Sequence, residues 1–343
     1  MRRSSALQSA GLAIALAIGP ANAVLSAHDF WIEPAAFETR AGSPVAIRLR
    51  VGEGLVGQPV PRAHGRIERF SAVGPAGEQA IEGPDGVDPA GVWRPIAEGP
   101  TWIVYRSRPH PHRAPAETFE RYLVEEGLDV ARALRAERQE TGSPGRERFS
   151  RCAKALLHVG VGDAGAALVR EPVGLPLELV PAIDPSRLAP DDELPVRLLF
   201  RGRPLAGAQV VAIPAADTSR SVVRRTDSSG RALLPLDRTG LWLVKAVWIE
   251  ALAGVEEADW ESWWASLTFA IPAVGATAGS GNRIRACRTP VTRRSRRTGA
   301  LRFRPPCGAA RGRGRPGCAG RGRRGQRSHA GLAGSPRRLA PTT

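Results

Sequence analysis

The feature that most constrains this fold is the strict alternation of apolar residues along short segments of the chain. Apolar side chains occupy every second position over residues 45–51, and again over residues 263–271. A period of two places alternate side chains on opposite faces of a β-strand, whereas a helix repeats every three to four residues. Turn sequences such as PAGE and GPDG separate further runs of this kind. The chain is therefore predicted to be mainly β.

The strand-like runs fall into two groups, over residues 28–112 and 170–272. In the second group, the pattern GRPLAGAQVVAI, RTDSSGRALLPL and GLWLVKAVW resembles transthyretin-like modules, also known as carboxypeptidase regulatory-like modules. In that pattern Asp227 opens a turn and Gly230 supplies a positive φ, so neither residue needs a catalytic role. The predicted fold class is mainly β, with two β-sandwich domains of immunoglobulin- or transthyretin-like type.

Residues 113–158 are predicted to be a helical insertion and linker between the two groups. Apolar spacing in PAETFERYLVEEGLDVARALRAERQE favours two short helices over about 115–140, joined at Gly127. In RFSRCAKALLHVG the apolar residues also have helical spacing, which would bury Cys152. Nothing near Cys152 predicts a depressed thiol pKa, so a structural role is favoured over a nucleophilic one.

Residues 1–27 have the pattern of a signal peptide. Met1-Arg2-Arg3 precede a short apolar run, and small residues follow. Cleavage fits the small-residue rule best after Ala23, with cleavage after Ala27 as the alternative. These features predict export by the general secretory route and a periplasmic or secreted location. No later apolar run is long enough to predict a membrane span.

Residues 273–343 form an Arg-rich tail. Of 49 basic and 33 acidic residues in the chain, the segment after residue 273 holds 18 arginines and no acidic residue, so residues 1–273 hold 31 basic and 33 acidic residues. The near balance in the body argues against nucleic acid as its partner. The tail lacks any strand or helix period and is predicted to be disordered. Two interpretations stay open for it: a polyanion-binding arm, or the product of a frameshift in a GC-rich gene.

Several motifs in the body resemble one bacterial family of exported proteins of unknown function. They are AHDFWIEP at the expected mature start, VRLRVGEG-like and RIERFxAVGP-like strands, RFSRCAKALL, and WESxWASLTFxIP at the end, together covering about residues 26–272. Members are often described as periplasmic components of nickel or cobalt uptake. The resemblance implies a transition-metal ligand and a membrane transport component as partner.

Four residues are candidate metal ligands: His28, Asp29, His110 and His112. If cleavage follows Ala27, His28 offers a metal both its α-amine and its imidazole, with the Asp29 carboxylate beside them. In RPHPHRAP the two histidines lie two positions apart, on one side of an extended segment. These nitrogen ligands suit Ni²⁺, Co²⁺ or Cu²⁺. The alternatives are a first strand that simply begins near His28 and a solvated Pro-rich loop at His110.

The rival function is a structural or carbohydrate-contacting surface module, which exposed tryptophans would favour. Its candidates are Trp31, Trp93, Trp102 and the tryptophans of residues 260–264. The chain contains no G-x-S-x-G, no H-E-x-x-H and no paired C-x-x-C motif. The sequence therefore predicts a binding protein and gives no positive support for an enzyme.

Overall fold

The structure is a computed structural model that describes residues 28–273. The expected signal peptide (1–27) and all but the first residue of the expected tail (273–343) lie outside the described residues. The described residues all belong to one compact unit. Strands dominate it, which confirms the mainly β fold class.

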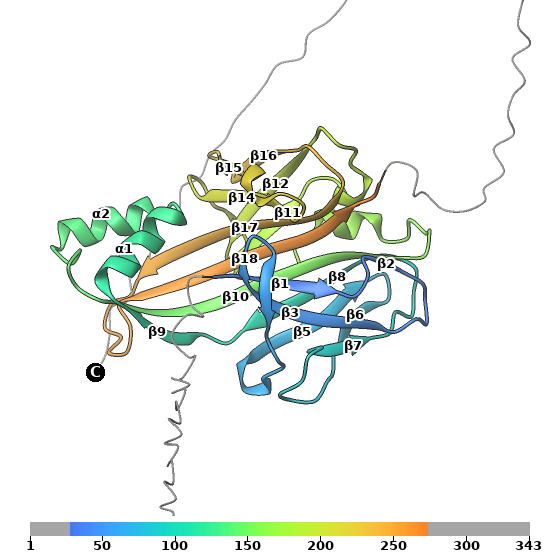
Figure 1. Cartoon of the computed structure of the whole chain (residues 1–343), viewed down its shortest axis with the longest axis horizontal. Helices are drawn as coiled ribbons and strands as arrows, with labels where there is room; N and C mark the ends of the chain where they lie inside the picture. The colour runs from blue at the N-terminus through green and yellow to red at the C-terminus, as the bar shows by residue number, and fades with distance from the viewer. Residues whose placement is uncertain (1–27, 274–343) are drawn as a thin grey trace, which may run out of the picture. The chain divides into compact units, whose positions relative to one another are not determined.

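A ten-stranded sheet, here called the middle sheet, forms the centre of the fold. Its strands in spatial order are β15 (Val222–Arg225), β14 (Gln209–Pro214), β17 (Gly240–Ala251), β18 (Trp260–Ile271), β10 (Gly145–Val159), β8 (Gly99–Ser107), β5 (Ile67–Gly74) and β6 (Gly77–Ala80), with β2 (Glu38–Thr39) and β9 (His110–Ala114) also paired to β10. The β10–β18 and β10–β2 pairs are parallel, and the other pairs are antiparallel. Figure 1 shows β10, β17 and β18 side by side as long strands.

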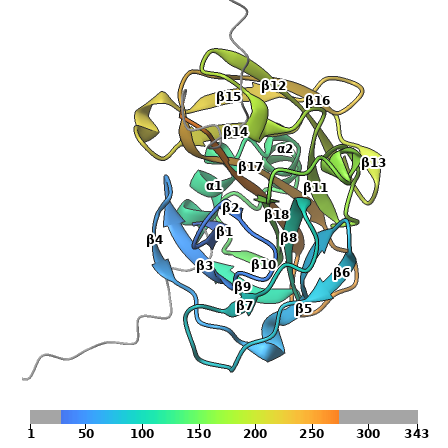
Figure 2. The same cartoon turned by 90° about the vertical axis from the view of Figure 1, so that its right-hand side faces the viewer.

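Two smaller sheets cover the middle sheet. The first sheet contains β1 (Asp29–Pro34), β3 (Val45–Glu53), β4 (Val56–Pro59) and β7 (Gly91–Trp93). The third sheet contains β11 (Leu177–Pro181), β12 (Asp192–Phe200), β13 (Arg203–Pro204) and β16 (Arg231–Leu236). In Figure 2 the first sheet lies with β5 and β8 in the lower part of the view, and the third sheet lies with β14 and β15 in the upper part.

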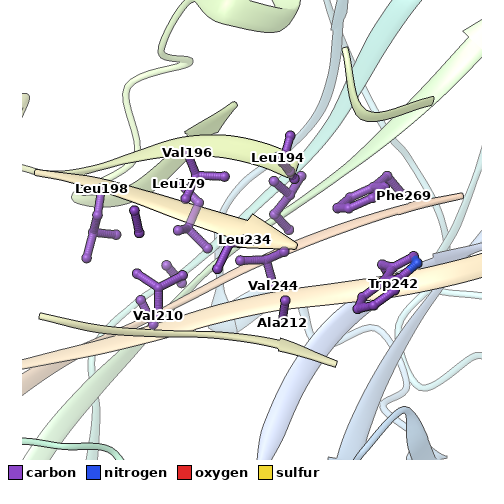
Figure 3. Close-up of a cluster of buried hydrophobic side chains, with 14 of the residues drawn as sticks. Leu179, Leu194, Val196, Leu198, Val210, Ala212, Leu234, Trp242, Val244 and Phe269 are labelled. Atoms are coloured by element: carbon purple, nitrogen blue, oxygen red, sulfur yellow. The ribbon is translucent and has the colours of Figure 1, made fainter. Parts of the chain in front are cut away.

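The two small sheets pack on opposite faces of the middle sheet. Along β8, Trp102 and Val104 belong to the core beneath the third sheet, whereas Ile103 and Tyr105 belong to the core beneath the first sheet. Figure 3 shows the former core, in which Trp242 of β17 lies near Phe269 of β18. The fold therefore consists of two β-sandwiches that share their middle sheet.

Two short helices cover one end of β17 and β18. Helix α1 is Ala116–Glu125 and α2 is Asp129–Glu137, and the chain turns between them at Gly127 with a φ of +66°. This pair confirms the helices predicted for residues 115–140. The apolar side of α1 packs against the sheet, with the Tyr122 ring stacked on Trp264 at 5.3 Å between centroids. No helix within residues 28–273 is long and apolar enough to cross a membrane.

Short 3-10 turns connect the remaining elements. They are η1 (His64–Arg66), η2 (Ala166–Arg170), η3 (Pro185–Arg187) and η4 (Thr218–Arg220). The turn at 227–230 has the structural role predicted from the sequence: Asp227 Oδ1 accepts hydrogen bonds from the backbone N–H of Ser229 and Arg231 at 2.8 and 2.9 Å. Gly230 has a φ of +73°, and a Cβ there would lie 2.7 Å from the Leu198 carbonyl oxygen.

The structure corrects one prediction made for residues 113–158. The segment expected to be a helical stripe and linker is the 15-residue strand β10, which pairs with four other strands. Cys152 faces one core of this strand and Ala153 faces the other. Burial raises the pKa of the Cys152 thiol to about 12. The predicted structural role of Cys152 fits this burial, although the predicted helix is wrong.

Candidate functional site

Strand β9 places the two candidate histidines on one side of the middle sheet. The strand runs antiparallel to β10, with His110 opposite Phe149 and His112 opposite Glu147. His110 and His112 are half-buried, whereas Pro111 between them is exposed, because side chains alternate along a strand. The His110 ring meets the Phe149 ring edge to face, 5.7 Å between centroids.

Both imidazoles line a cavity of about 490 Å³ between the first sheet and the middle sheet. Besides β9, five further segments contribute to its wall. They supply Phe30 from β1, Val51 from β3, Val60, Pro61, Ala63 and Arg66 from the run before β5, Tyr105, Ser107 and Arg108 at the end of β8, and Phe149 and Arg151 from β10. This volume lies within the ~300–1,000 Å³ range of small-molecule sites. We refer to it as the β9 cavity.

Aromatic rings make up much of the cavity wall. The Phe30 and Tyr105 rings lie 5.0 Å apart, and the Arg151 guanidinium lies 5.0 Å from the centre of the Phe149 ring. Such rings offer flat apolar surface, and their faces attract the guanidinium. The wall therefore combines apolar contact area with a cation.

Arg151 is buried and fixed from several sides. It donates a hydrogen bond to the His28 carbonyl oxygen at 3.0 Å and lies 4.6 Å from the Trp264 ring centre. Burial lowers its pKa to about 10, while the nearby charges of Asp29 and Glu147 oppose that shift. Arg151 is therefore still a cation at neutral pH.

The pKa values of both cavity histidines are lowered. For His110 the main cause is burial, and the charge of Arg66 adds to it. For His112 burial is again the main cause, followed by the charges of His110 and Arg151. Both imidazoles are therefore neutral at pH 7, the state in which a ring nitrogen can accept a hydrogen bond or bind a metal.

His28 and Asp29 lie at the start of the described chain, outside the cavity wall. The Nδ1 atom of His28 lies 3.2 Å from Glu53 Oε1, although the two atoms do not meet hydrogen-bond geometry. Asp29 instead forms a buried ion pair, with its Oδ1 2.7 Å from Lys245 Nζ, and Lys245 contacts Glu126 Oε1 at the same distance. Asp29 thus links β1 to β17 and, through Lys245, to the end of α1.

The structure does not gather the four candidate ligands into one site. His110 and His112 both line the β9 cavity. His28 contacts the cavity residue Arg151 only through its backbone carbonyl oxygen, and Asp29 forms an ion pair with Lys245. Across residues 28–273, no group of three or more His, Cys, Asp or Glu side chains could hold a metal ion. A metal in the cavity would have two imidazole ligands from the wall and would need further ligands from elsewhere.

The arginines of the cavity were missed by the sequence reasoning. Arg66 ends η1, Arg108 follows β8, and Arg151 lies within β10, so the fold unites residues that are far apart in sequence. A partial signal existed in RSRPHPHR, where basic residues flank both histidines. That local pattern could have indicated a basic site, although it does not reveal Arg66 or Arg151.

The residues proposed for sugar contact are buried. Trp31, Trp102 and Trp260 are each 1% exposed, and Trp93, Trp263 and Trp264 are also buried. Two carboxylates beside Trp260 in the sequence, Asp259 and Glu261, form salt bridges with Arg146 and Arg148, respectively. The described residues thus lack the exposed rings on which the carbohydrate-contacting alternative depends.

Comparison with solved structures finds low overall similarity. The D0-D1 domain of intimin matches with 12% identity and a TM-score of 0.18, over 70% of this chain and 97% of that chain. A Salmonella alpha-2-macroglobulin mutant matches with 13% identity and a TM-score of 0.16, over 72% of this chain and 15% of that chain. These scores are too low to support an argument about function.

Comparison of the sequence gives a clearer result. No curated protein matches the chain significantly. The profile of a domain of unknown function, DUF4198, matches residues 25–250, which include the whole first sheet and all lining residues of the β9 cavity. The match covers more than half of the chain and confirms the resemblance to a family of unknown function. The chain therefore belongs to the DUF4198 family.

Proposed function

We propose that this chain is an exported periplasmic binding protein that holds a small ligand in the β9 cavity. The observation that carries the proposal is the cavity itself: its volume is about 490 Å³, and its lining includes three aromatic residues, two neutral histidines and the buried Arg151. Ligand sites are concave and mostly apolar, with a few convergent polar groups that fix orientation. The signal-like N-terminus supports an extracytoplasmic location.

The proposal assigns the chain a carrier role and no catalytic step. A carrier in the periplasm would deliver its ligand to a membrane transport component, the partner implied by the family resemblance. Because the first sheet and the middle sheet, which flank the cavity, pack together through one buried core, its walls are held in place and the cavity is preformed. A preformed cavity binds without a large ordering cost.

Filling the cavity tests this function. Ala63 lines the cavity from an exposed loop, so Ala63→Trp should fill part of the cavity without disturbing a core. Gln58→Trp on the exposed strand β4 adds the same ring outside the lining and is the matched control. Ligand-observed NMR against a fragment set should give hits that Ala63→Trp abolishes and Gln58→Trp retains. Equal binding to both variants would show that the ligands bind elsewhere.

A transition metal, Ni²⁺, Co²⁺ or Cu²⁺, is the second candidate ligand. The observation in its favour is that His110 and His112 share one side of β9 and have lowered pKa values. The His28 α-amine would add a nitrogen ligand if cleavage follows Ala27. The positive charges of Arg66 and Arg151 argue against a bare dication, because they lower the affinity of the cavity for any cation.

Two Ni²⁺ titrations test the metal candidate. His112→Gln should weaken binding by at least tenfold if the cavity imidazoles are ligands, whereas His64→Gln, at an exposed position outside the cavity, should not. The second titration compares protein with a free His28 terminus and the same protein with a Gly-Ser extension before it. Equal affinities in that comparison would remove the terminal amine from the site.

A further inference from the structure

The charges of the β9 cavity all have one sign. Three arginines line it, Arg66, Arg108 and Arg151, and no aspartate or glutamate does. Lining charges of one sign in a partly enclosed site raise the local concentration of ligands of the opposite sign. This pattern contrasts with the body of the chain as a whole, in which basic and acidic residues are nearly balanced.

Arg66 and Arg108 are backbone neighbours in the cavity lining. The backbone N–H of Arg108 donates a hydrogen bond to the Arg66 carbonyl oxygen at 2.8 Å, so their side chains start from adjoining positions. Both side chains are exposed, and neither forms a salt bridge with an acidic residue of the described chain. An arginine without a protein counter-ion can direct two N–H donors of its guanidinium at the two oxygens of a ligand carboxylate.

The charge of Arg66 also reaches the interior of the cavity. It contributes to the lowered pKa of His110 and opposes the burial that raises the pKa of Tyr105 to about 12. The neutral imidazoles then offer polar atoms without adding positive charge. Phe30 and Phe149 supply the apolar wall behind these groups.

We infer that the β9 cavity binds a small organic anion, with a carboxylate held by Arg66 and Arg108 and a flat apolar body against Phe30 and Phe149. The guanidinium fork matches a carboxylate in a bidentate geometry, which gives orientation as well as affinity. This inference rests on the proposed function, because it names the class of ligand for the same cavity. It adds a preference for negatively charged ligands, which the proposed function alone does not require.

Three probes of one shape and different charge test the inference. They are isophthalate, its neutral diamide isophthalamide, and the dication of 1,3-bis(aminomethyl)benzene, each titrated into the protein by isothermal calorimetry. Isophthalate should bind at least tenfold more tightly than the diamide, and the dication should bind most weakly. Added NaCl should weaken isophthalate binding and leave diamide binding unchanged, because salt screens the exposed guanidiniums.

Charge-removing variants assign the preference to named residues. Arg66→Gln and Arg108→Gln should each weaken isophthalate binding by about threefold to tenfold, as expected for one charged contact at a partly exposed position. Neither variant should change binding of the diamide. Arg224→Gln on β15 removes an exposed arginine outside the cavity lining, and it should change isophthalate binding by less than about twofold.

The possible failures are distinguishable. Equal affinity for isophthalate and the diamide, or tighter binding of the dication, would overturn the anion preference and leave the cavity as a binding site. An isophthalate preference that survives both Arg→Gln variants would overturn the assignment to Arg66 and Arg108. If no probe binds at millimolar concentration, both this inference and the proposed function are contradicted.

Discussion

Lys245 offers the sharpest test of how the elements beside the cavity are held together. Its Nζ atom lies 2.7 Å from both Asp29 Oδ1 and Glu126 Oε1, and the three side chains are only 18, 7 and 8% exposed. Lys245→Met keeps the apolar stem and removes the charge. Because two buried carboxylates then lack their cation, we expect a loss of about 3–5 kcal/mol in the free energy of unfolding at pH 7.

The loss should depend on pH in a defined direction. Burial and the charge of Asp29 already raise the pKa of Glu126 in the wild type, where Lys245 opposes them. Removing Lys245 raises this pKa further, so that the folded variant keeps a proton that the unfolded chain has lost. Stability gained by such a proton is present at low pH and is lost as pH rises through the raised pKa. Between pH 7 and pH 5 the variant should therefore recover about 2 kcal/mol relative to the wild type, since one pKa unit is ~1.4 kcal/mol.

Urea unfolding at both pH values measures this effect. The double variant Lys245→Met/Glu126→Gln should recover at least half of the loss at pH 7, because only one carboxylate is then left without its cation. Arg224→Met, at an exposed cation, should cost less than about 0.5 kcal/mol. A loss below about 1 kcal/mol for Lys245→Met, unchanged between pH 7 and pH 5, would refute the reasoning.

Three further predictions concern the cores and one turn. Trp242→Ala should cost about 3 kcal/mol or more in urea unfolding, because its ring is fully buried, and a loss below about 1 kcal/mol would contradict that burial. Burial raises the pKa of Glu147, so the protonated carboxyl group stabilises the folded state at low pH. This stabilisation is lost as pH rises through the raised pKa. Glu147→Gln should therefore flatten the fall in stability between pH 4 and pH 7, and an unchanged pH profile would contradict this. Gly230→Ala should cost more than about 1 kcal/mol by thermal unfolding, because of its positive φ and the nearby carbonyl, whereas a change within about 0.3 kcal/mol would show that the turn adapts.

The half-buried strands could be predicted from the sequence, and the doubly buried strand could not. Strand β3 alternates between buried and half-buried residues, so its period of two is visible. Strand β10 is buried on both faces, so every position from Phe149 to Leu157 is free to be small or apolar. Its apolar residues then matched a helical spacing by chance, which is why the segment was predicted to be a helical linker.

The candidate site was predictable only where its residues are neighbours in sequence. His110 and His112 belong to one strand, and their two-residue spacing alone predicts that they lie on the same side of it. Arg66 and Arg151 come from other strands and loops, and only tertiary packing brings them to the same cavity. Asp29 is adjacent to His28 in sequence, but its strand directs the carboxylate to Lys245. A side-chain pairing of this kind depends on the fold and has no local signal.

The central claim is that a small anion occupies the β9 cavity, and a crystal structure of the protein soaked with isophthalate tests it most directly. We predict density for the ring against Phe30 and Phe149, with a carboxylate within about 3 Å of the Arg66 or Arg108 guanidinium. Binding that is measurable in solution, together with ligand density elsewhere on the protein and an unoccupied β9 cavity, would contradict the claim.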